Sequence, residues 1–566
     1  MASLAGRAVT VSRRWLPVCY RPLVKPGLPH VYSEATCAET GPKILRVRAT
    51  RVLAAVSAAT AYMNPSARNS GTPSAMSMRP RQQQRRLRSV AAGLGAEAGQ
   101  RSLSTVPTSQ PLAAATTATA AVATTAAAAV VPAAGLSARG EHVRTSKQQT
   151  QATALYYGGS ALVGPRRAAT NLPALIDLGV AESYPTVGPI IEAEGLTAAV
   201  AEAAASAVLG PDHAAMYPQP ESGPLREAIA AVMAENVLRG APCRAEEVVV
   251  AAGATAALEA LVFAICNEND ALIVPAPLYP AFYIDVGMRA GVTIIPTKAA
   301  AGAGPITYEA LADAAQRACK AGKTVRGVLF TSPCNPRGTL HTRAETAAVE
   351  AFAVERGVHL IHDAVYAGTA FDESEAVESL PQLPEAYRDG RLHTLWALSK
   401  DFGLPGWKVG VVHSRNPHVL QAIEPQLRFA GASRLAQFCS LALLRDPVRA
   451  RRCLRRAASA LQGRAKAGRE ALLDAGMPAA ALAGGEPGAG PLDLIDFGAA
   501  AASLDEEALW EQMLECGVHV VRGEACGVGR PGAMRVCWGG ASSDDEAREA
   551  ARRMAKAFFQ QLQLQQ

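Results

Sequence analysis

The sequence predicts an α/β protein whose β-sheet is mostly parallel and is covered by helices on both faces. From about residue 150 onward, apolar strand-like runs alternate with segments that carry apolar residues at helical spacing. Four of the strand-like runs end in polar clusters, "GAT", "SPCNPRG", "HDAVY" and "LSK". Because ligands bind at the carboxyl ends of parallel strands, these clusters indicate one shared pocket.

The elements of this sheet follow from local patterns. "EVVVAAGATAALEALVFAICN" is typical of a strand, a glycine turn and a helix, and "PLREAIAAVMAENVLRG" before it is typical of a helix that ends at Gly240. Further strands are expected in "DALIVPAPLYPAF", "VRGVLFTSPCNPRGT", "GVHLIHDAVY" and "TLWAL", with a helix in "TRAETAAVEAFAVERG".

A second, smaller α/β part is expected near the C-terminus. A long helical stretch from Asp446 to Gly476 precedes strand-like "LDLIDF" and "AMRVCWGG". We therefore expect one folded region, 151–566, in which 216–420 form the large part and 170–215 with 421–555 form the smaller part.

Residues 1–150 differ from the rest in composition. They are rich in Arg, Ala, Ser, Thr and Pro and poor in acids, and they contain a long Ala/Thr tract without periodicity. This indicates a low-complexity, disordered extension. An acid-poor, Arg- and Ser-containing N-terminus also fits a chloroplast or mitochondrial transit peptide, with a cytoplasmic protein as the alternative. A start codon chosen too far upstream would give the same pattern, since Met63, Met76 and Met78 follow.

The composition excludes several other classes. No residue between Arg101 and Arg139 is charged, but Ala and Thr are barely apolar, so we expect no membrane span there. The net charge of +7 comes largely from the N-terminal region, and the basic run "RPRQQQRRLR" has no accompanying nucleic-acid-binding motif. The 11 cysteines form no CxxC pair, which argues against a metal site and a disulfide framework.

Lys400 is the residue most easily assigned to chemistry. It follows the buried run "TLWAL" and precedes a loop with three glycines, a position unlike that of a surface lysine. An amine there could form an imine with an aldehyde cofactor, of which pyridoxal phosphate is the usual one. Such a cofactor needs a carboxylate at its pyridine nitrogen, donors at its ring oxygen, an aromatic cover and a phosphate cradle.

The sequence offers a candidate for each of these roles. Asp363 is the candidate carboxylate, and Asn335 and Tyr366 are the donors to the ring oxygen. Tyr279 can stack on the ring. For the phosphate, the turn before a helix supplies Ala254 and Thr255, and Lys408 adds positive charge.

The residues from about 170 to 545 resemble the fold type I pyridoxal-phosphate enzymes of the class I/II aminotransferase superfamily. Within it, the likeness is to the 1-aminocyclopropane-1-carboxylate (ACC) synthases. The strings that carry it are "IDLGVAES", "GATAALEALVFAICNENDALIVPAPLYPAF", "TSPCNPRGT", "YAGTAF", "LSKDFGLPGWKVG" and "GAMRVCW".

The resemblance implies further roles. Lys400 is the Schiff-base lysine, Ser399 belongs to the cofactor site, and Arg535 grips the substrate carboxylate. Tyr217 matches a tyrosine that reaches the phosphate from a partner subunit, which implies a homodimer with shared sites. Glu182, with its neighbour Ala181, matches a glutamate that faces the substrate and is linked to the use of S-adenosylmethionine.

Two reactions remain open for such an enzyme. Amino-group transfer from an α-amino acid to a 2-oxo acid is favoured because Ser183, Ala397 and Lys408 depart from the synthase pattern. ACC synthase activity, with release of methylthioadenosine from S-adenosylmethionine, is the alternative. A non-catalytic cofactor-binding protein is a remote alternative, since Lys400, Asp363 and Arg535 are all retained.

We predict that residues 1–150 are dispensable for folding and catalysis, because they lack the periodic apolar faces from which a core is built. A chain that starts near residue 150 should match the full chain in solubility and activity when both are purified side by side. Loss of soluble, active protein on truncation would contradict this.

Overall fold

The computed structural model describes residues 173–209, 223–298, 304–501 and 504–564. The predicted extension of residues 1–150, with its transit-peptide assignment, lies outside these ranges. No helix among the described residues is long and apolar enough to cross a membrane. All nine cysteines of the described ranges are free thiols.

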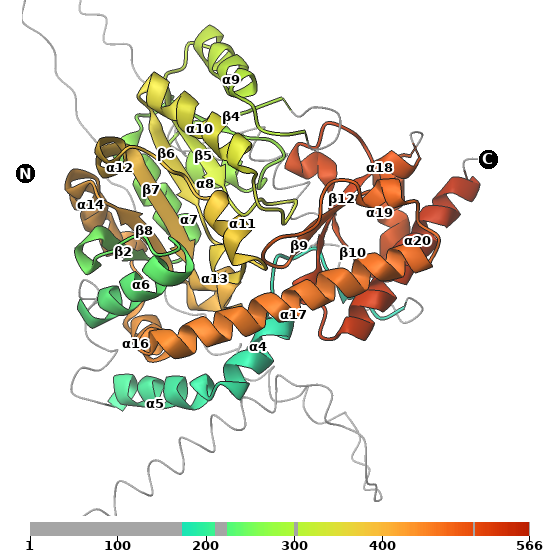
Figure 1. Cartoon of the computed structure of the whole chain (residues 1–566), viewed down its shortest axis with the longest axis horizontal. Helices are drawn as coiled ribbons and strands as arrows, with labels where there is room; N and C mark the ends of the chain where they lie inside the picture. Colours follow the sequence, from blue (N-terminus) through green and yellow to red (C-terminus); the bar gives the residue numbers. More distant parts are fainter. Residues whose placement is uncertain (1–172, 210–222, 299–303, 502–503, 565–566) are drawn as a thin grey trace, which may run out of the picture. The chain divides into compact units, whose positions relative to one another are not determined.

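Within these ranges, the central sheet has seven strands in the order β2-β8-β7-β6-β5-β3-β4 (Figure 1). Only β8 runs against its neighbours, β2 and β7, so the other strands share one direction. The strands are β2 (Val248–Ala251), β3 (Ala271–Val274), β4 (Thr293–Pro296), β5 (Val325–Thr331), β6 (His359–Asp363), β7 (Leu392–Ala397) and β8 (Gly410–Ser414).

The antiparallel strand β8 refines the prediction of a parallel sheet. Twelve residues, 398–409, separate β7 from β8, and they are taken up by α13 (Leu398–Asp401), η4 (Pro405–Trp407) and loops. A parallel return needs a crossover that carries the chain back across the whole sheet. The short connection instead sends β8 back alongside β7, and it brings Lys400 and Lys408 to the same end of the sheet.

Helices cover both faces of the sheet, as predicted. Alternate residues of one strand enter different cores: Val249 packs in a cluster with α7, α8 and α14, and Val248 and Val250 pack with α6 and α16 on the other face. The helices α9 and α10 cover β3, β5 and β6 on that same second face. Their bounds are α6 (Gly223–Asn236), α7 (Ala254–Ile265), α8 (Phe282–Gly287), α9 (Tyr308–Lys320), α10 (Arg343–Arg356), α14 (Pro417–Ile423) and α16 (Arg434–Leu444).

The smaller part is built on an antiparallel sheet of order β11-β12-β9 and a short parallel pair, β1 with β10. Its core lies between these strands and the helices α17, α19 and α20. The bounds are β1 (Ile176–Asp177), β9 (Leu492–Asp496), β10 (Val518–His519), β11 (Val521–Arg522), β12 (Ala533–Cys537), α17 (Pro447–Asp474), α18 (Phe497–Ala500), α19 (Glu506–Glu515) and α20 (Asp544–Leu564).

The long helix α17 joins the two parts and runs along both in Figure 1. Its first half packs Cys453 and Leu454 into the core of the large part, and its second half packs Ala471 and Leu472 into the core of the smaller part. Pro447 starts the helix, and the Asp446 side chain accepts a hydrogen bond from the Arg449 amide at 3.0 Å, which caps it.

The division between the parts differs from the sequence-based boundaries. Residues 421–444, assigned above to the smaller part, pack on the large sheet through Ile423 and Leu443. The helices α4 (Tyr184–Ala193) and α5 (Leu196–Leu209) also contribute Val187 and Leu196 to the core of the large part. The apolar faces of α4 and α5 pack against α16 and α17. Local sequence patterns do not encode this tertiary pairing.

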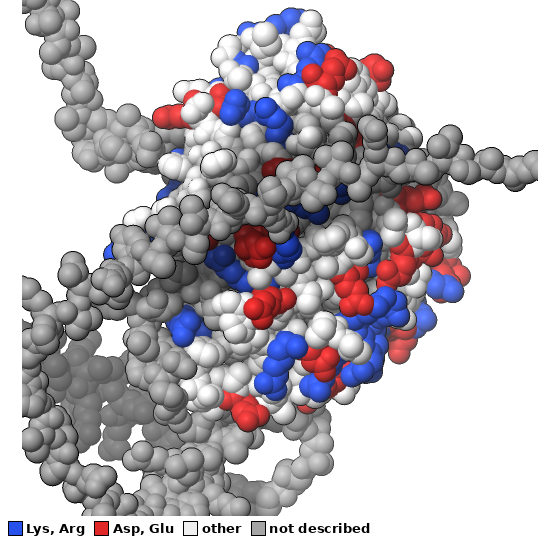
Figure 2. Space-filling model, turned by 60° about the vertical axis from the view of Figure 1, so that its left-hand side comes forward, with Lys and Arg blue, Asp and Glu red and all other residues white. Residues whose placement is uncertain are grey.

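The remaining short elements connect these layers. They are η2 (Ala245–Glu247), η3 (Ala367–Thr369), α11 (Glu373–Glu378), α12 (Glu385–Arg391), η5 (Glu424–Gln426), α15 (Leu427–Ala430), η6 (Ala479–Leu482), η7 (Gly523–Cys526) and η8 (Trp538–Gly540). On the face seen in Figure 2, basic and acidic side chains of the described residues are interspersed. This face therefore offers no large one-sign patch of the kind that binds nucleic acid.

We predict that Gly410→Ala destabilises the chain. A Cβ at Gly410 would lie 2.2 Å from the backbone carbon of Gly253, and backbone atoms cannot move aside as a flexible side chain would. Overpacking of this kind costs about 1–3 kcal/mol in the free energy of unfolding, measurable by urea denaturation.

Gly463→Ala is the matched control for this prediction. No atom lies within 4 Å of a Cβ at Gly463, in the middle of α17, so alanine should raise helix stability by up to about 1 kcal/mol. A Gly410→Ala protein as stable as the unmutated chain would mean that the two backbones are not in close contact.

Candidate active site

A cavity of about 240 Å³ lies where β2, β5, β6 and β7 end. Ten residues predicted from the sequence line it: Ala181, Ala254, Thr255, Tyr279, Asn335, Asp363, Tyr366, Ser399, Lys400 and Lys408. The polar clusters at the strand ends are thus brought together, as the fold class predicts. Two further candidates, Glu182 and Arg535, do not line this cavity.

Lys400 lies on α13, directly after the buried strand β7. The residue is half-buried because it faces the cavity. Its amine lies inside, where Nζ donates a hydrogen bond to the Ala181 carbonyl oxygen at 2.6 Å. Burial lowers the pKa of Lys400 below its ordinary value, and the positive charge of Arg535 acts in the same direction. A lowered pKa makes the neutral, nucleophilic amine more accessible.

Asp363, the last residue of β6, is a buried carboxylate. The Thr331 hydroxyl donates to its Oδ2 at 3.3 Å. Burial raises the pKa of Asp363 to about 6, against the effect of that hydrogen bond. Such a carboxylate is strongly stabilised by a cationic partner, which is what a protonated pyridine nitrogen supplies.

Asn335 and Tyr366 point at each other across the cavity floor. The Asn335 Nδ2 donates to the Tyr366 hydroxyl at 3.3 Å, and both residues are buried. The Asn335 Oδ1 is buried with no hydrogen-bond partner among the described residues. A buried amide that is only half satisfied is costly, so this site suits a ligand with polar atoms.

The phosphate end is formed by the start of α7. Gly253 takes a φ of 93°, which favours glycine, and turns the chain from β2 into the helix at Ala254. The first amides of a helix have no partners within it and suit an anion. Lys408 packs beside this turn, since its Cδ lies 3.6 Å from the position of a Cβ on Gly253.

Tyr279 also lines the cavity and meets Phe282 edge-on, with ring centroids 5.2 Å apart and an interplanar angle of 87°. This contact fixes the orientation of the tyrosine ring. Tyr217 lies outside the described residues, so its role at the phosphate and the homodimer that it implies stay predictions.

Asp285 was missed by the sequence analysis. It lies on α8 and lines the cavity with Thr255 and Lys408. Burial raises the pKa of Asp285 to about 7, and the nearby Asp363 adds to this, while a hydrogen bond from Thr255 and the charge of Lys408 act against it. An acid within the apolar run "AFYIDVG" is the signal that could have pointed to it.

Asp401, next to Lys400, was also missed. It is fully buried and accepts hydrogen bonds from the Trp396 indole at 2.7 Å, the Gly368 amide at 2.9 Å and the Thr369 hydroxyl at 3.1 Å. These bonds tie the helix of Lys400 to the strand before it and to the loop that follows Tyr366. Asp401 therefore positions the site without lining it.

The segment before α4 closes the cavity next to Lys400. Ala181 accepts the lysine hydrogen bond, and the Ser183 hydroxyl donates to the Lys400 carbonyl oxygen at 2.9 Å. Glu182, between them, is exposed and does not line the cavity. Its negative charge still raises the pKa of Lys400, so it lies close to the amine.

Arg535 lies in β12, the middle strand of the smaller sheet, and is fully buried. Its Nη2 donates to the Gly179 carbonyl oxygen at 2.5 Å. The guanidinium thus holds the segment that carries Ala181 and Ser183. Its charge lowers the pKa of Lys400, so Arg535 lies near the amine although it does not line the cavity.

Among the described residues, no group of three or more His, Cys, Asp or Glu could hold a metal ion. The donor set instead consists of an enclosed amine, a buried carboxylate, a buried amide with an unpartnered oxygen and a helix N-terminus. Fold and site together define a pyridoxal-phosphate-dependent enzyme.

The chain belongs to the class I and II aminotransferase family, whose model matches residues 192–554. It is 34% identical over 319 residues to an ACC synthase of Arabidopsis thaliana, covering 55% of this chain and 68% of the relative. It is 33% identical over 405 residues to an ACC synthase of Oryza sativa subsp. japonica, covering 66% and 80%. An ACC synthase of Oryza sativa subsp. indica is 36% identical over 310 residues, covering 52% and 62%.

Solved structures share the fold at lower sequence identity. An aspartate aminotransferase mutant of Thermus thermophilus is 23% identical, with a TM-score of 0.59, and the match covers 75% of this chain and 99% of that one. A multiple substrate aminotransferase of Thermococcus profundus is 18% identical, with a TM-score of 0.59 and coverage of 76% and 99%. The predicted α/β fold and the resemblance to this superfamily are confirmed.

Pyridoxal phosphate is the cofactor of this family, and the residues in the cavity fit it. Lys400 is placed to hold its aldehyde carbon, Asp363 its pyridine nitrogen, and Asn335 with Tyr366 its ring oxygen. The start of α7 with Lys408 suits its phosphate. These individual roles stay predictions.

We predict that Lys400 carries the cofactor. Borohydride reduction of the chain loaded with pyridoxal phosphate should fix the label on Lys400, because that amine is enclosed and its pKa is lowered. Peptide mapping identifies the labelled lysine. The Lys408→Arg protein should keep the label and the Lys400→Arg protein should lose it; a label on Lys408 would sink the assignment.

The second prediction for this site concerns pH. Because the pKa of Asp285 is raised from 3.8 to about 7, the folded chain without cofactor holds an extra proton between about pH 4 and pH 7. Stability falls with pH wherever the folded state binds more protons, so the free energy of unfolding should decrease across this window.

Asp285→Asn should remove part of that decrease. The variant should gain stability relative to the unmutated chain at pH 8 and gain less at pH 5, by urea denaturation of the cofactor-free proteins. Asp545→Asn, at an exposed acid of α20, is the control. A gain from Asp285→Asn that is equal at both pH values would contradict a titrating Asp285.

Proposed function

We propose that the chain transfers the amino group of an α-amino acid to a 2-oxo acid, as an ACC-synthase-like aminotransferase. The observation that carries this choice is the place of Glu182. This carboxylate was assigned to a sulfonium substrate, but it is exposed and lies off the cavity wall. Its neighbour Ser183 does not line the cavity either, and its hydroxyl donates to the Lys400 carbonyl oxygen.

The residues around the cavity suit the shared first half of both candidate reactions. When bound, pyridoxal phosphate supplies an electron sink for the substrate α-carbon. The Lys400 Nζ would take the substrate α-proton as a general base. Asp363 would hold the ring nitrogen in its protonated form. Arg535, which lies off the cavity wall but is buried and near Lys400, would orient the substrate carboxylate with its forked donors.

The two reactions differ in what happens to that proton. For amino-group transfer, the Lys400 amine would have to hold that proton and release it again within the site, so the amine must stay close to the cavity and be free to move. The contact of Nζ with the Ala181 carbonyl supports this role, because one hydrogen bond to a backbone oxygen is easily exchanged for a substrate contact.

The alternative is ACC synthase activity, and the curated relatives favour it. The three relatives described above are named ACC synthases. In that reaction the γ-sulfonium of S-adenosylmethionine leaves as methylthioadenosine. An acid near the sulfonium would help, and Glu182 is close enough for its charge to affect Lys400. A small shift of the 181–183 segment would be needed to bring Glu182 into the cavity.

The test measures both reactions on one preparation of the loaded enzyme. We predict that amino-group transfer from a panel of α-amino acids to 2-oxo acids outruns release of methylthioadenosine from S-adenosylmethionine. Lys400→Ala is the control for both, because neither reaction proceeds without the base. Efficient ACC formation with no transfer to any 2-oxo acid would replace our proposal by the synthase.

Glu182→Gln separates the two readings further. If the enzyme is an aminotransferase, this variant should change the transfer rate little, because Glu182 does not line the cavity. In a synthase, the loss of the carboxylate should raise the KM for S-adenosylmethionine.

A further inference from the structure

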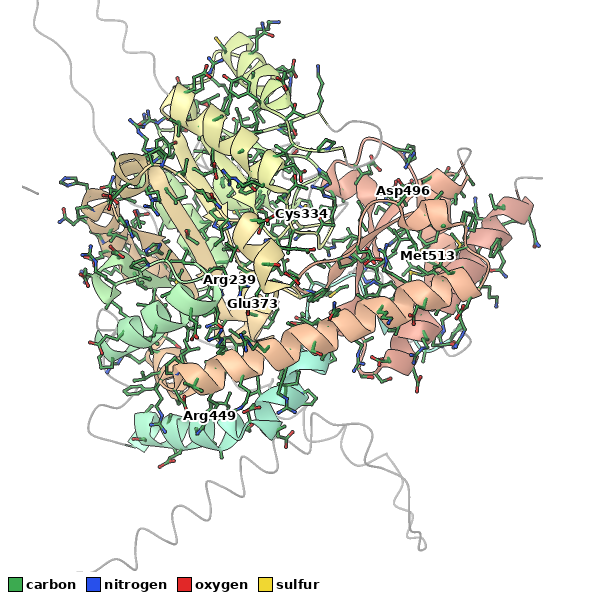
Figure 3. The ribbon with its side chains drawn as sticks, in the orientation of Figure 1. Arg239, Cys334, Glu373, Arg449, Asp496 and Met513 are labelled. Atoms are coloured by element: carbon green, nitrogen blue, oxygen red, sulfur yellow. The ribbon has the colours of Figure 1, made fainter. Side chains whose placement is uncertain are left out.

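A second cluster of ionisable side chains lies beside the active site and has no part in the proposed reaction. It consists of Cys334, Arg337, His341 and Glu345, all of them buried. The first two lie in the loop after β5, and Cys334 immediately precedes Asn335. This loop, in which Figure 3 labels Cys334, contacts the smaller part, since the Gly338 carbonyl accepts hydrogen bonds from the amides of Gly488 and Ala489.

The thiol of Cys334 is held between two cationic groups. The Arg337 Nε donates to its sulfur at 3.5 Å, and His341 also lowers the pKa of the thiol. Burial alone would raise the pKa of this thiol, but Arg337 and His341 outweigh it and lower the pKa to about 6. At neutral pH the sulfur is therefore mostly a thiolate, the reactive form of cysteine.

His341 is fixed in its charged form. Its Nε2 lies 3.0 Å from the Thr331 carbonyl oxygen, so that nitrogen must carry a proton. Its Nδ1 lies 3.7 Å from the Glu345 carboxylate, which favours a second proton. Burial would lower the pKa of His341, but Cys334 and Glu345 raise it to about 9. The ring is thus an imidazolium beside a thiolate.

A cavity of about 10 Å³ opens beside this pair, large enough for about one water molecule. Cys334, Asn335, Arg337 and His341 line it. Two polar atoms of its walls, the His341 Nδ1 and the Asn335 Oδ1, are buried with no hydrogen-bond partner among the described residues. The cavity shares only Asn335 with the active-site cavity. The cavity is therefore a small polar space lined by the nucleophilic sulfur of Cys334.

We propose that Cys334 is a peroxide-reactive thiolate, a modification site reached by hydrogen peroxide, which is only slightly larger than the water molecule that fits the cavity, and closed to bulky electrophiles. The sulfur attacks one peroxide oxygen, an S–O bond forms and the O–O bond breaks. The departing hydroxide takes the Nδ1 proton of His341 and leaves as water. Sulfur is oxidised to a sulfenic acid and the peroxide is reduced. The added oxygen lies beside Asn335, a residue of the cofactor cavity.

The test treats the reduced, folded full chain with hydrogen peroxide, stops the reaction with catalase, and unfolds the chain in urea with dimedone to trap sulfenic acid. Peptide mass spectrometry then gives a rate for each cysteine. The exposed Cys319 is the internal control. At pH 7 we expect Cys334 to react about tenfold faster than Cys319. The rate depends on the fraction of each thiol that is ionised, and this effect outweighs the greater solvent exposure of Cys319.

Two variants and a second oxidant separate this site from accidental oxidation. Arg337→Gln and His341→Gln should each slow Cys334 severalfold and leave Cys319 unchanged, with circular dichroism as the check on folding. Cumene hydroperoxide, which is too large for the cavity, should react with Cys319 but hardly with Cys334.

The comparison within the unmutated chain stands even if a variant fails to fold. The proposal would be overturned if hydrogen peroxide oxidised Cys334 no faster than Cys319. It would also be overturned if Cys334 reacted at the same rate with hydrogen peroxide and with cumene hydroperoxide. None of these measurements uses catalysis, so their outcome is independent of the reaction that the active site performs.

Discussion

The buried carboxylate of Asp401 is the interaction on which the active site depends. It joins three pieces of chain that meet at the end of the sheet: the indole of Trp396 in β7, the loop of Gly368 and Thr369, and the helix of Lys400. Burial raises the pKa of Asp401 to about 7, and a buried carboxyl group must be satisfied by partners in fixed places. The position of the Lys400 amine relative to Tyr366 is therefore set by the donors to Asp401.

The second constraint is the tie between the two parts of the fold. The helix α17 enters both cores, so neither part can pack fully without it. Arg535 of the smaller sheet bonds to the Gly179 carbonyl, and the segment after Gly179 bonds to Lys400 through Ala181 and Ser183. A substrate carboxylate bound at Arg535 would therefore affect the position of Lys400 through the backbone of residues 179–183.

The active-site cavity holds acids and a lysine close together. Asp363 and Asp285 both line it, and burial raises the pKa of each. Lys408 and the start of α7 supply positive potential at the phosphate end. A cationic ring nitrogen at Asp363 would offset the effect of burial and favour the ionised form of that carboxylate.

Local patterns in the sequence were enough to determine the alternation of strands and helices, the strand-end clusters and the residues Lys400, Asp363, Asn335 and Tyr366, because each signal lies within about ten neighbouring residues. Only the tertiary structure decided the reversal of β8, the packing of α4, α5 and 421–444 on the large sheet, and the positions of Glu182 and Arg535 off the cavity wall. The same holds for Asp285, Asp401 and the pairing of Cys334 with His341. These features arise from contacts across elements, in which burial and the charge of a distant neighbour set the state of each group.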